Sequence, residues 1–264
     1  MEPARPGARP AITMRLARHA PLRRCMYCLA RGVPLSEEHL IPRALGGHLT
    51  LRDAVCEPCR VFTGRLEQAT LEREFAVPKT LLALKRRRAR GKGPTRLPPV
   101  ALAGDGGSAA IALDADAYPR RFELPVFDEA GLLAGIDRAG AAPRIAFAPC
   151  HLRLGTPTRD HAAAPPALPD PHAYAIAVAK WAYAMDVAAH GLDGRDTSAI
   201  RDLLAGRRHD VFNFVGTAHP RRAAAREWLH GATTRDNGPW RTVVLDLLGS
   251  AGLPPYEVVV GPRA

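Results

Sequence analysis

The chain has 264 residues, 47% of them hydrophobic, which is long enough for one large or two small domains with buried cores. Its formal net charge of +11 is confined to the first 100 residues, which predicts a polyanion as the partner of that part, although a basic surface without a partner would look the same. The longest apolar run, broken by Lys180 and Asp186, is too short to cross a bilayer, and an odd count of five cysteines disfavours a disulfide framework, so a cytoplasmic protein is expected.

Residues 1–20 are rich in arginine and proline and are predicted to form a basic arm without regular structure. Residues 21–78 are predicted to form a compact finger. It would contain a strand over residues 35–41, a turn at Gly46-Gly47 and a helix over residues 60–75. The apolar face of this helix is predicted to comprise Phe62, Leu66 and Ala69.

Four cysteines lie in the finger as two Cys-x-x-Cys pairs with 27 residues between the pairs: Cys25, Cys28, Cys56 and Cys59. Four thiolates at this spacing are the ligand set of a tetrahedral structural zinc site. Four reduced thiols or a redox dithiol are the alternatives, but no thioredoxin-like pattern surrounds either pair. We therefore predict one zinc ion, which would stabilise a finger too small to fold on its core alone. The fifth cysteine, Cys150, is predicted to be a buried, unreactive thiol despite its neighbour His151.

Between the two pairs, the run Glu38-His39-Leu40-Ile41-Pro42 is followed by Gly46-Gly47. Together with the flanking cysteines, this pattern resembles the HNH endonuclease superfamily (the ββα-metal or His-Me finger), in particular the subgroup with a four-cysteine zinc. The resemblance covers about residues 20–75. It implies a β-hairpin that presents the acid–histidine pair, a following helix, and a structural zinc that is distinct from the catalytic ion. The predicted fold class is α+β, with an N-terminal zinc-stapled ββα finger and a C-terminal mixed α+β domain.

The resemblance also implies a role for each residue of the motif. His39 would be the general base that takes a proton from the attacking water. Glu38 would coordinate a catalytic divalent ion, Mg²⁺ or Mn²⁺, which stabilises the leaving oxygen. Arg43 and the basic arm would hold neighbouring phosphates. Glu37 is expected on the opposite face of the strand from Glu38, and His48 is expected to be an ordinary turn residue.

One position departs from the family pattern. The residue after the second cysteine pair is usually Asn or His and completes the catalytic metal shell. Here it is Arg60, whose guanidinium has no acceptor and carries a permanent charge. Three interpretations stay open: Glu57 or Asp53 replaces the missing ligand, Arg60 itself neutralises the phosphate, or the cleavage centre is inactive.

Residues 79–100 are predicted to be a basic helix, over residues 80–90, and a linker. The densest basic stretch of the chain lies in this helix and would follow a phosphate backbone, although a solvated linker would have the same composition. Its residues are Lys85, Arg86, Arg87 and Arg88.

Residues 101–264 are predicted to form a mixed α+β domain to which the sequence assigns no role. Its clearest element is a helix that begins at Pro171, is capped by Asp170 and ends at Gly191. The apolar stripe of this helix, expected to be core, comprises Tyr174, Val178, Trp181 and Met185. The other predicted elements are strands over residues 109–113, 122–127, 243–245 and 257–260 and helices over residues 197–204 and 221–230.

These features predict a metal-dependent HNH-type endonuclease that hydrolyses phosphodiester bonds, with DNA as the expected target. A catalytically inactive zinc-finger protein that binds nucleic acid is the first alternative. A protein-interaction module is the second. The expected cofactors are a structural zinc ion and, in an active enzyme, Mg²⁺ or Mn²⁺.

Overall fold

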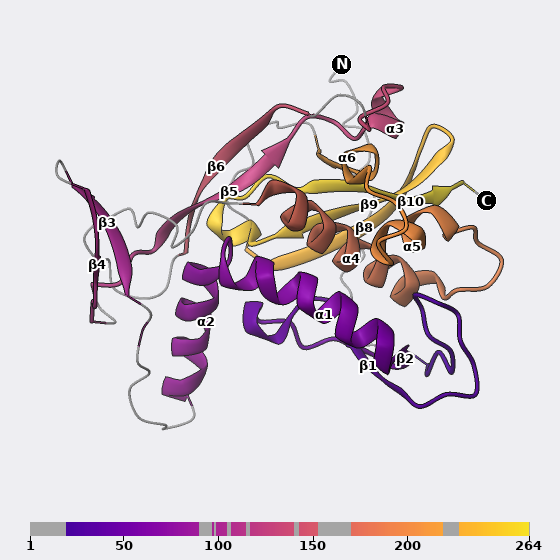
Figure 1. Ribbon diagram of the computed structural model, residues 1–264, viewed down its shortest axis with the longest axis horizontal. Helices are drawn as coiled ribbons and strands as arrows, with labels where there is room; N and C mark the ends of the chain where they lie inside the picture. Colours follow the sequence, from indigo (N-terminus) through magenta and orange to yellow (C-terminus); the bar gives the residue numbers. More distant parts are fainter. Residues whose placement is uncertain are drawn as a thin grey trace, which may run out of the picture.

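The computed structural model describes residues 20–89, 97, 99–104, 107–114, 117–139, 143–152, 170–218 and 227–263. Within these ranges the protein is a mixed α+β structure with antiparallel sheets, as predicted (Figure 1). The predicted arm over residues 1–20 lies outside the described residues except for its last position, and most of the predicted linker after residue 90 also lies outside them.

The N-terminal elements are β1 (Leu35–His39), the 3-10 turn η1 (Arg43–Leu45), β2 (Thr50–Cys56), α1 (Glu57–Glu72) and α2 (Ala76–Ala89). Two hairpins follow, formed by β3 (Val100–Gly104) with β4 (Gly107–Ile111) and by β5 (Arg121–Phe127) with β6 (Ile145–His151), and α3 (Gly131–Ala134) lies between β5 and β6. The C-terminal elements are α4 (Pro171–His190), α5 (Ser198–Leu204), α6 (Val211–Phe214), β7 (Val215–Thr217), β8 (His230–Asn237), β9 (Trp240–Leu247), η2 (Gly249–Ala251) and β10 (Tyr256–Pro262).

The finger begins with an antiparallel hairpin of β1 and β2. Its register shifts between Ser36 and Glu38, where β2 bulges and Asp53 takes a φ of 48°. The predicted turn at Gly46-Gly47 is confirmed. Gly46 has a φ of 96°, and a Cβ on Gly47 would lie 1.9 Å from the Ile41 carbonyl oxygen, so both positions require glycine.

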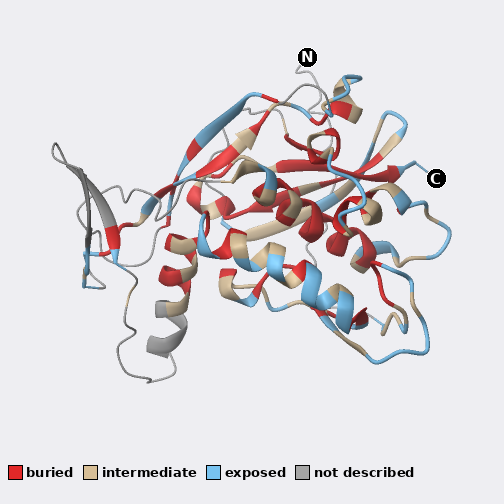
Figure 2. Ribbon diagram, in the orientation of Figure 1, coloured by how far each residue is buried: buried red, intermediate tan, exposed pale blue. Residues whose placement is uncertain are grey.

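Helix α4 lies between α1 on one side and the sheet β7-β10-β9-β8 on the other (Figure 1). The predicted start of α4 is confirmed, because Asp170 accepts hydrogen bonds from the backbone N–H groups of His172 and Ala173. Gly191 follows its last residue with a φ of 73°, as predicted. Figure 2 shows α4 buried along most of its length, which explains why its sequence is apolar almost all round.

The finger and the C-terminal elements share one hydrophobic cluster. Tyr183 of α4 donates a hydrogen bond of 2.6 Å to the carbonyl oxygen of Met26, which lies between the first two cysteines. His230 of β8 bonds the carbonyl oxygen of Leu45 in η1 at 2.8 Å. The predicted division at residue 100 stays a prediction, but the finger is packed directly onto α4 and β8.

Helix α1 departs from its predicted start and face. It begins at Glu57, before Cys59, because Cys56 is extended at the N-cap and Pro58 suits the first turn. The predicted apolar face is wrong at Phe62, which is 42% exposed, whereas Leu66 and Ala69 are half-buried. The residues that the helix buries fully are Thr63, Thr70 and Leu71. Thr63 and Thr70 can be buried because their hydroxyl groups donate to carbonyl oxygens.

Two other helix predictions need correction. The helix expected over residues 80–90 begins earlier, at Ala76, and includes Pro78 in its first turn. The helix expected over residues 221–230 lies partly outside the described residues, but its C-terminal end is wrong, because residues 227–229 are bends and His230 opens strand β8. The strands predicted near 109–113, 122–127, 243–245 and 257–260 and the helix near 197–204 are confirmed, with small shifts of their ends. Among the described residues, no helix is long and apolar enough to cross a membrane.

Candidate functional site

The four cysteines converge where the first loop of the finger meets the start of α1. Cys25 and Cys28 lie in a tight loop that is closed by a hydrogen bond from the Leu29 N–H to the Cys25 carbonyl. Cys56 ends β2, and Cys59 lies in the first turn of α1. The Met26 N–H donates to the carbonyl oxygen of Ala54 at 2.8 Å, so the loop is fixed against β2.

Their ligand atoms fit a single metal ion. The four sulfur atoms all lie within 4.8 Å of one another, and the sulfurs of Cys28 and Cys56 are 3.6 Å apart. A tetrahedral zinc ion with Zn–S bonds of about 2.3 Å holds its sulfurs about 3.8 Å apart. The predicted convergence of the cysteines is therefore confirmed, and the group could hold a metal ion such as zinc.

The pKa values of the cysteine thiols are shifted in opposite directions. Burial would raise the pKa of Cys25, but backbone hydrogen bonds, led by those from Cys28 and Cys56, outweigh it and lower that pKa. Burial raises the pKa of Cys59, and a neighbouring Cys25 thiolate raises it further. A bound metal ion would remove this mutual repulsion by holding all four sulfurs as thiolates.

Cys150, the fifth cysteine, is buried on β6, as predicted. Burial raises the pKa of its thiol to about 12, which keeps it protonated and unreactive. Its neighbour His151 is exposed, because successive strand residues point to opposite faces, so the two do not form a nucleophile–base pair.

The acid of the Glu-His motif lies at the interface between the finger and α4. Glu38 is only 5% exposed, and its Oε1 atom is 2.9 Å from the Nζ atom of Lys180. The same oxygen accepts a hydrogen bond of 3.1 Å from the hydroxyl group of Tyr27, which stands between the first two cysteines. Glu37 is exposed, as predicted from the alternation of the strand.

Lys180 joins three elements at this point. Its Nζ atom is also 2.9 Å from Oε1 of Glu67 in α1, and the indole N–H of Trp181 donates to that oxygen at 2.7 Å. Burial alone would lower the pKa of Lys180, but the carboxylates of Glu38 and Glu67 outweigh burial and raise it. The ammonium group therefore stays charged between two carboxylates.

His39 ends β1 and is partly exposed, opposite Thr50 in the hairpin register. Because it follows Glu38 on the strand, its side chain points to the other face. The hairpin thus places the histidine toward the surface and the acid toward α4. The predicted role of His39 as general base stays a prediction.

Arg60 and Glu57 pair with each other on the exposed side of α1, with guanidinium–carboxylate distances of 2.8 and 2.6 Å. The carboxylate of Glu57 is thus held by Arg60, at the surface. Asp53, the other predicted substitute ligand, is exposed at the bulge of β2. The structure therefore does not bring Arg60, Glu57 or Asp53 together with Glu38, whose carboxylate instead faces a lysine.

The predicted nucleic-acid contacts are placed only in part. Arg43 is exposed at the start of η1, next to the Gly46-Gly47 turn. Lys85, Arg86, Arg87 and Arg88 lie within helix α2, but their side chains are outside the described part of the structure.

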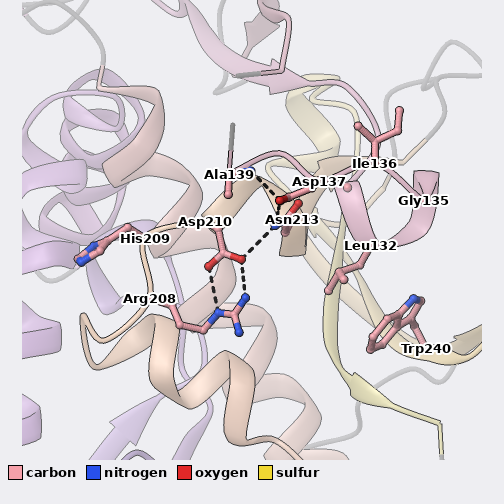
Figure 3. Close-up of a pocket in the computed structure, with 11 residues that line it drawn as sticks. Leu132, Gly135, Ile136, Asp137, Ala139, Arg208, His209, Asp210, Asn213 and Trp240 are labelled. Atoms are coloured by element: carbon pink, nitrogen blue, oxygen red, sulfur yellow. Dashed lines mark hydrogen bonds and ion pairs between the residues drawn. The ribbon is translucent and has the colours of Figure 1, made fainter. Parts of the chain in front are cut away.

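A cavity of about 840 Å³ opens away from the motif, between α3, α6 and the start of β9 (Figure 3). Leu132 and Trp240 lie on one side of it, and polar groups lie on the other. Asn213 donates to Asp137 and to Asp210, and Asp210 is held by Arg208, which lowers the pKa of that carboxyl to about 2. These polar groups are already paired with one another, so the cavity offers a ligand mainly apolar contact.

The partners of Glu38 could not be found from the sequence, although one signal was present. Lys180 interrupts the most apolar stretch of the chain, and a charged residue on a fully buried helix requires a buried counter-charge. Nothing in the sequence spacing indicated that this counter-charge would be Glu38 and Glu67, since they lie in another part of the chain. No protein-family model, curated protein or solved structure matches this chain.

Proposed function

We propose that this protein binds nucleic acid through its finger, and that the four cysteines hold a zinc ion which fixes the finger in shape. Zinc is favoured because four thiolates in a closed tetrahedral set are typical of structural zinc sites. The finger would then be folded only when the metal is bound.

The observation that carries this proposal is a difference in how exposed arginines are paired. Among the described residues of the C-terminal part, five of the six exposed arginines, all but Arg121, form ion pairs with carboxylates: Arg144, Arg207, Arg208, Arg235 and Arg263. Among the described residues of the finger, only two of the seven exposed arginines, Arg60 and Arg73, form ion pairs. The other five have neither an ion pair nor a side-chain hydrogen bond within the described part of the chain: Arg23, Arg31, Arg43, Arg52 and Arg65. Unpaired guanidinium groups on one part of a molecule favour contact with phosphates.

Binding of a labelled DNA duplex at several salt concentrations tests the proposal. Replacing Arg43, Arg52 and Arg65 by alanine should weaken binding and reduce the slope of log K against log salt by roughly 0.9 for each phosphate that is no longer neutralised. The matched control replaces Arg144, Arg207 and Arg263 by alanine, which should leave the slope unchanged. An equal weakening in both variants, or none in either, would contradict the proposal. A duplex of RNA in the same assay separates the two nucleic acids.

Metal-dependent hydrolysis of phosphodiester bonds, which the resemblance implies, stays a prediction. It rests on the Glu-His-x-x-Pro motif and on the partly exposed His39 at the end of β1. Incubation of plasmid with Mg²⁺ or Mn²⁺ tests it directly. Nicking that disappears in His39→Ala would establish the nuclease, and a protein that neither nicks nor binds DNA would favour the protein-interaction module.

A further inference from the structure

We infer that the ammonium group of Lys180 takes the place that a catalytic divalent ion would have beside Glu38, and that the protein does not hold such an ion there. A lysine in this place affects the acid–histidine motif alone, and the protein could bind nucleic acid with or without it. The atom concerned is the buried Nζ atom of Lys180.

The geometry of that nitrogen matches the position of a shared cation. Nζ of Lys180 lies 2.9 Å from Oε1 of Glu38 and 2.9 Å from Oε1 of Glu67. Two carboxylate oxygens from a hairpin strand and from the following helix thus converge on one positive charge. This is the kind of pairing that a hard cation would make with the same oxygens.

Little room remains there for a second cation. Oε1 of Glu38 already accepts from Lys180 and from the Tyr27 hydroxyl group. Mg²⁺ requires six oxygen ligands in near-ideal octahedral geometry, so it would have to displace both donors and bring in several waters. Glu38 and Lys180 are each only 5% exposed, so water has little access to this pair.

Lys180 is also held in place by its surroundings. Its neighbours in α4 are fully buried, and Tyr183, one turn further on, is bonded to Met26 of the finger. The position that the resemblance assigns to a second metal ligand holds Arg60, whose guanidinium has no acceptor and is paired with Glu57 at the surface. Lys180 thus occupies the space beside Glu38, and Arg60 supplies no second ligand.

The consequence is a structural role for the acid of the motif. Glu38 would be a positioning residue that fastens β1 to α4 and α1, while His39 on the opposite face has no metal-bound oxygen beside it. We therefore expect nucleic acid to be bound without a divalent ion.

Titration of the zinc-loaded protein with Mn²⁺ at pH 7, followed by the electron paramagnetic resonance signal of the free ion, tests the inference. Wild type should leave the signal as it is in buffer. Lys180→Ala, which removes the ammonium group and leaves space for water, should take up about one Mn²⁺ per chain, because two carboxylates lose their counter-charge. The double variant Lys180→Ala with Glu38→Gln should lose this uptake. Lys79→Ala, which removes a half-buried lysine elsewhere, should behave as wild type.

Stoichiometric uptake of Mn²⁺ by wild type that is abolished in Glu38→Gln would overturn the inference, and so would a folded Lys180→Ala that gains no Mn²⁺. If Lys180→Ala loses its zinc and fails to fold, the comparison of wild type with Glu38→Gln decides the question without it. DNA binding is measured separately, so its loss would contradict the proposed function and leave this inference unaffected.

Discussion

Two groups of side chains in the finger differ in the cation that lies beside them or that they could bind. We call the four cysteines the cysteine end and the surroundings of Glu38 the acid end. At the cysteine end, four sulfur atoms lie within 4.8 Å of one another, and the cluster consists of thiols alone. At the acid end, the carboxylate of Glu38 lies against the ammonium group of Lys180. The first arrangement suits a bound metal ion, whereas the second already contains its cation. The four cysteines could therefore hold a metal ion, whereas Glu38 is buried against a lysine of α4.

The largest effect is expected at the cysteine end. Cys56→Ser removes one of four zinc ligands, and since structural zinc sites contribute on the order of 10–16 kcal/mol of apparent binding free energy, the finger should unfold. Zinc content and thermal unfolding measure the effect. Cys150→Ser is the control, because Cys150 lies in β6, outside the cluster, and it should keep both its zinc and its finger. A Cys56→Ser protein with unchanged unfolding would show that the fold needs no metal.

Substitutions around Glu38 should lower the unfolding free energy by less than the loss of zinc does, and a second substitution should recover part of the loss. Lys180→Met leaves Glu38 and Glu67 without their shared counter-charge, and breaking such a buried pair costs about 3–5 kcal/mol of unfolding free energy. Adding Glu38→Gln should recover part of this stability, since one of the two charges is then removed as well. Urea unfolding of both variants measures the recovery. Equal destabilisation in the single and double variants would mean that the charges of Glu38 and Lys180 are not coupled.

The smallest of these effects tests the contact between the finger and β8. Burial lowers the pKa of His230 to about 4, below its ordinary value of 6.5. The unfolded chain therefore binds a proton at a higher pH than the folded one, so stability is full above pH 6.5 and falls as the pH drops toward 4. A shift of this size corresponds to about 3 kcal/mol. His230→Gln should flatten the dependence of the unfolding free energy on pH between pH 4 and 6.5. An unchanged dependence would show that His230 is not the group that causes it.

Several elements could be predicted from sequence because their signals are local. The cysteine spacing, the cap at Asp170, the stop at Gly191 and the Gly46-Gly47 turn each depend on residues close together in the chain. The face of α1 could not be predicted, because its burial is decided by contacts with α4 more than 100 residues away. Phe62 is exposed there, while Thr70 is buried through a bond to the carbonyl oxygen of Ala173.

The candidate site divides in the same way. The four cysteines could be identified from their spacing, and their convergence is confirmed. The environment of Glu38 could not be identified, since a resemblance that covers about residues 20–75 contains neither Lys180 nor Trp181. A motif predicts the ligands it contains, but it does not predict a competing cation supplied by another part of the chain.

One measurement tests the contrast between the two ends most directly. The purified protein is dialysed against zinc and manganese together, passed through metal-free buffer, and its metals are counted. The account predicts about one zinc ion per chain, lost in Cys56→Ser, and no retained manganese. Retained manganese in stoichiometric amount that disappears in Glu38→Gln, or a folded protein without zinc, would contradict it.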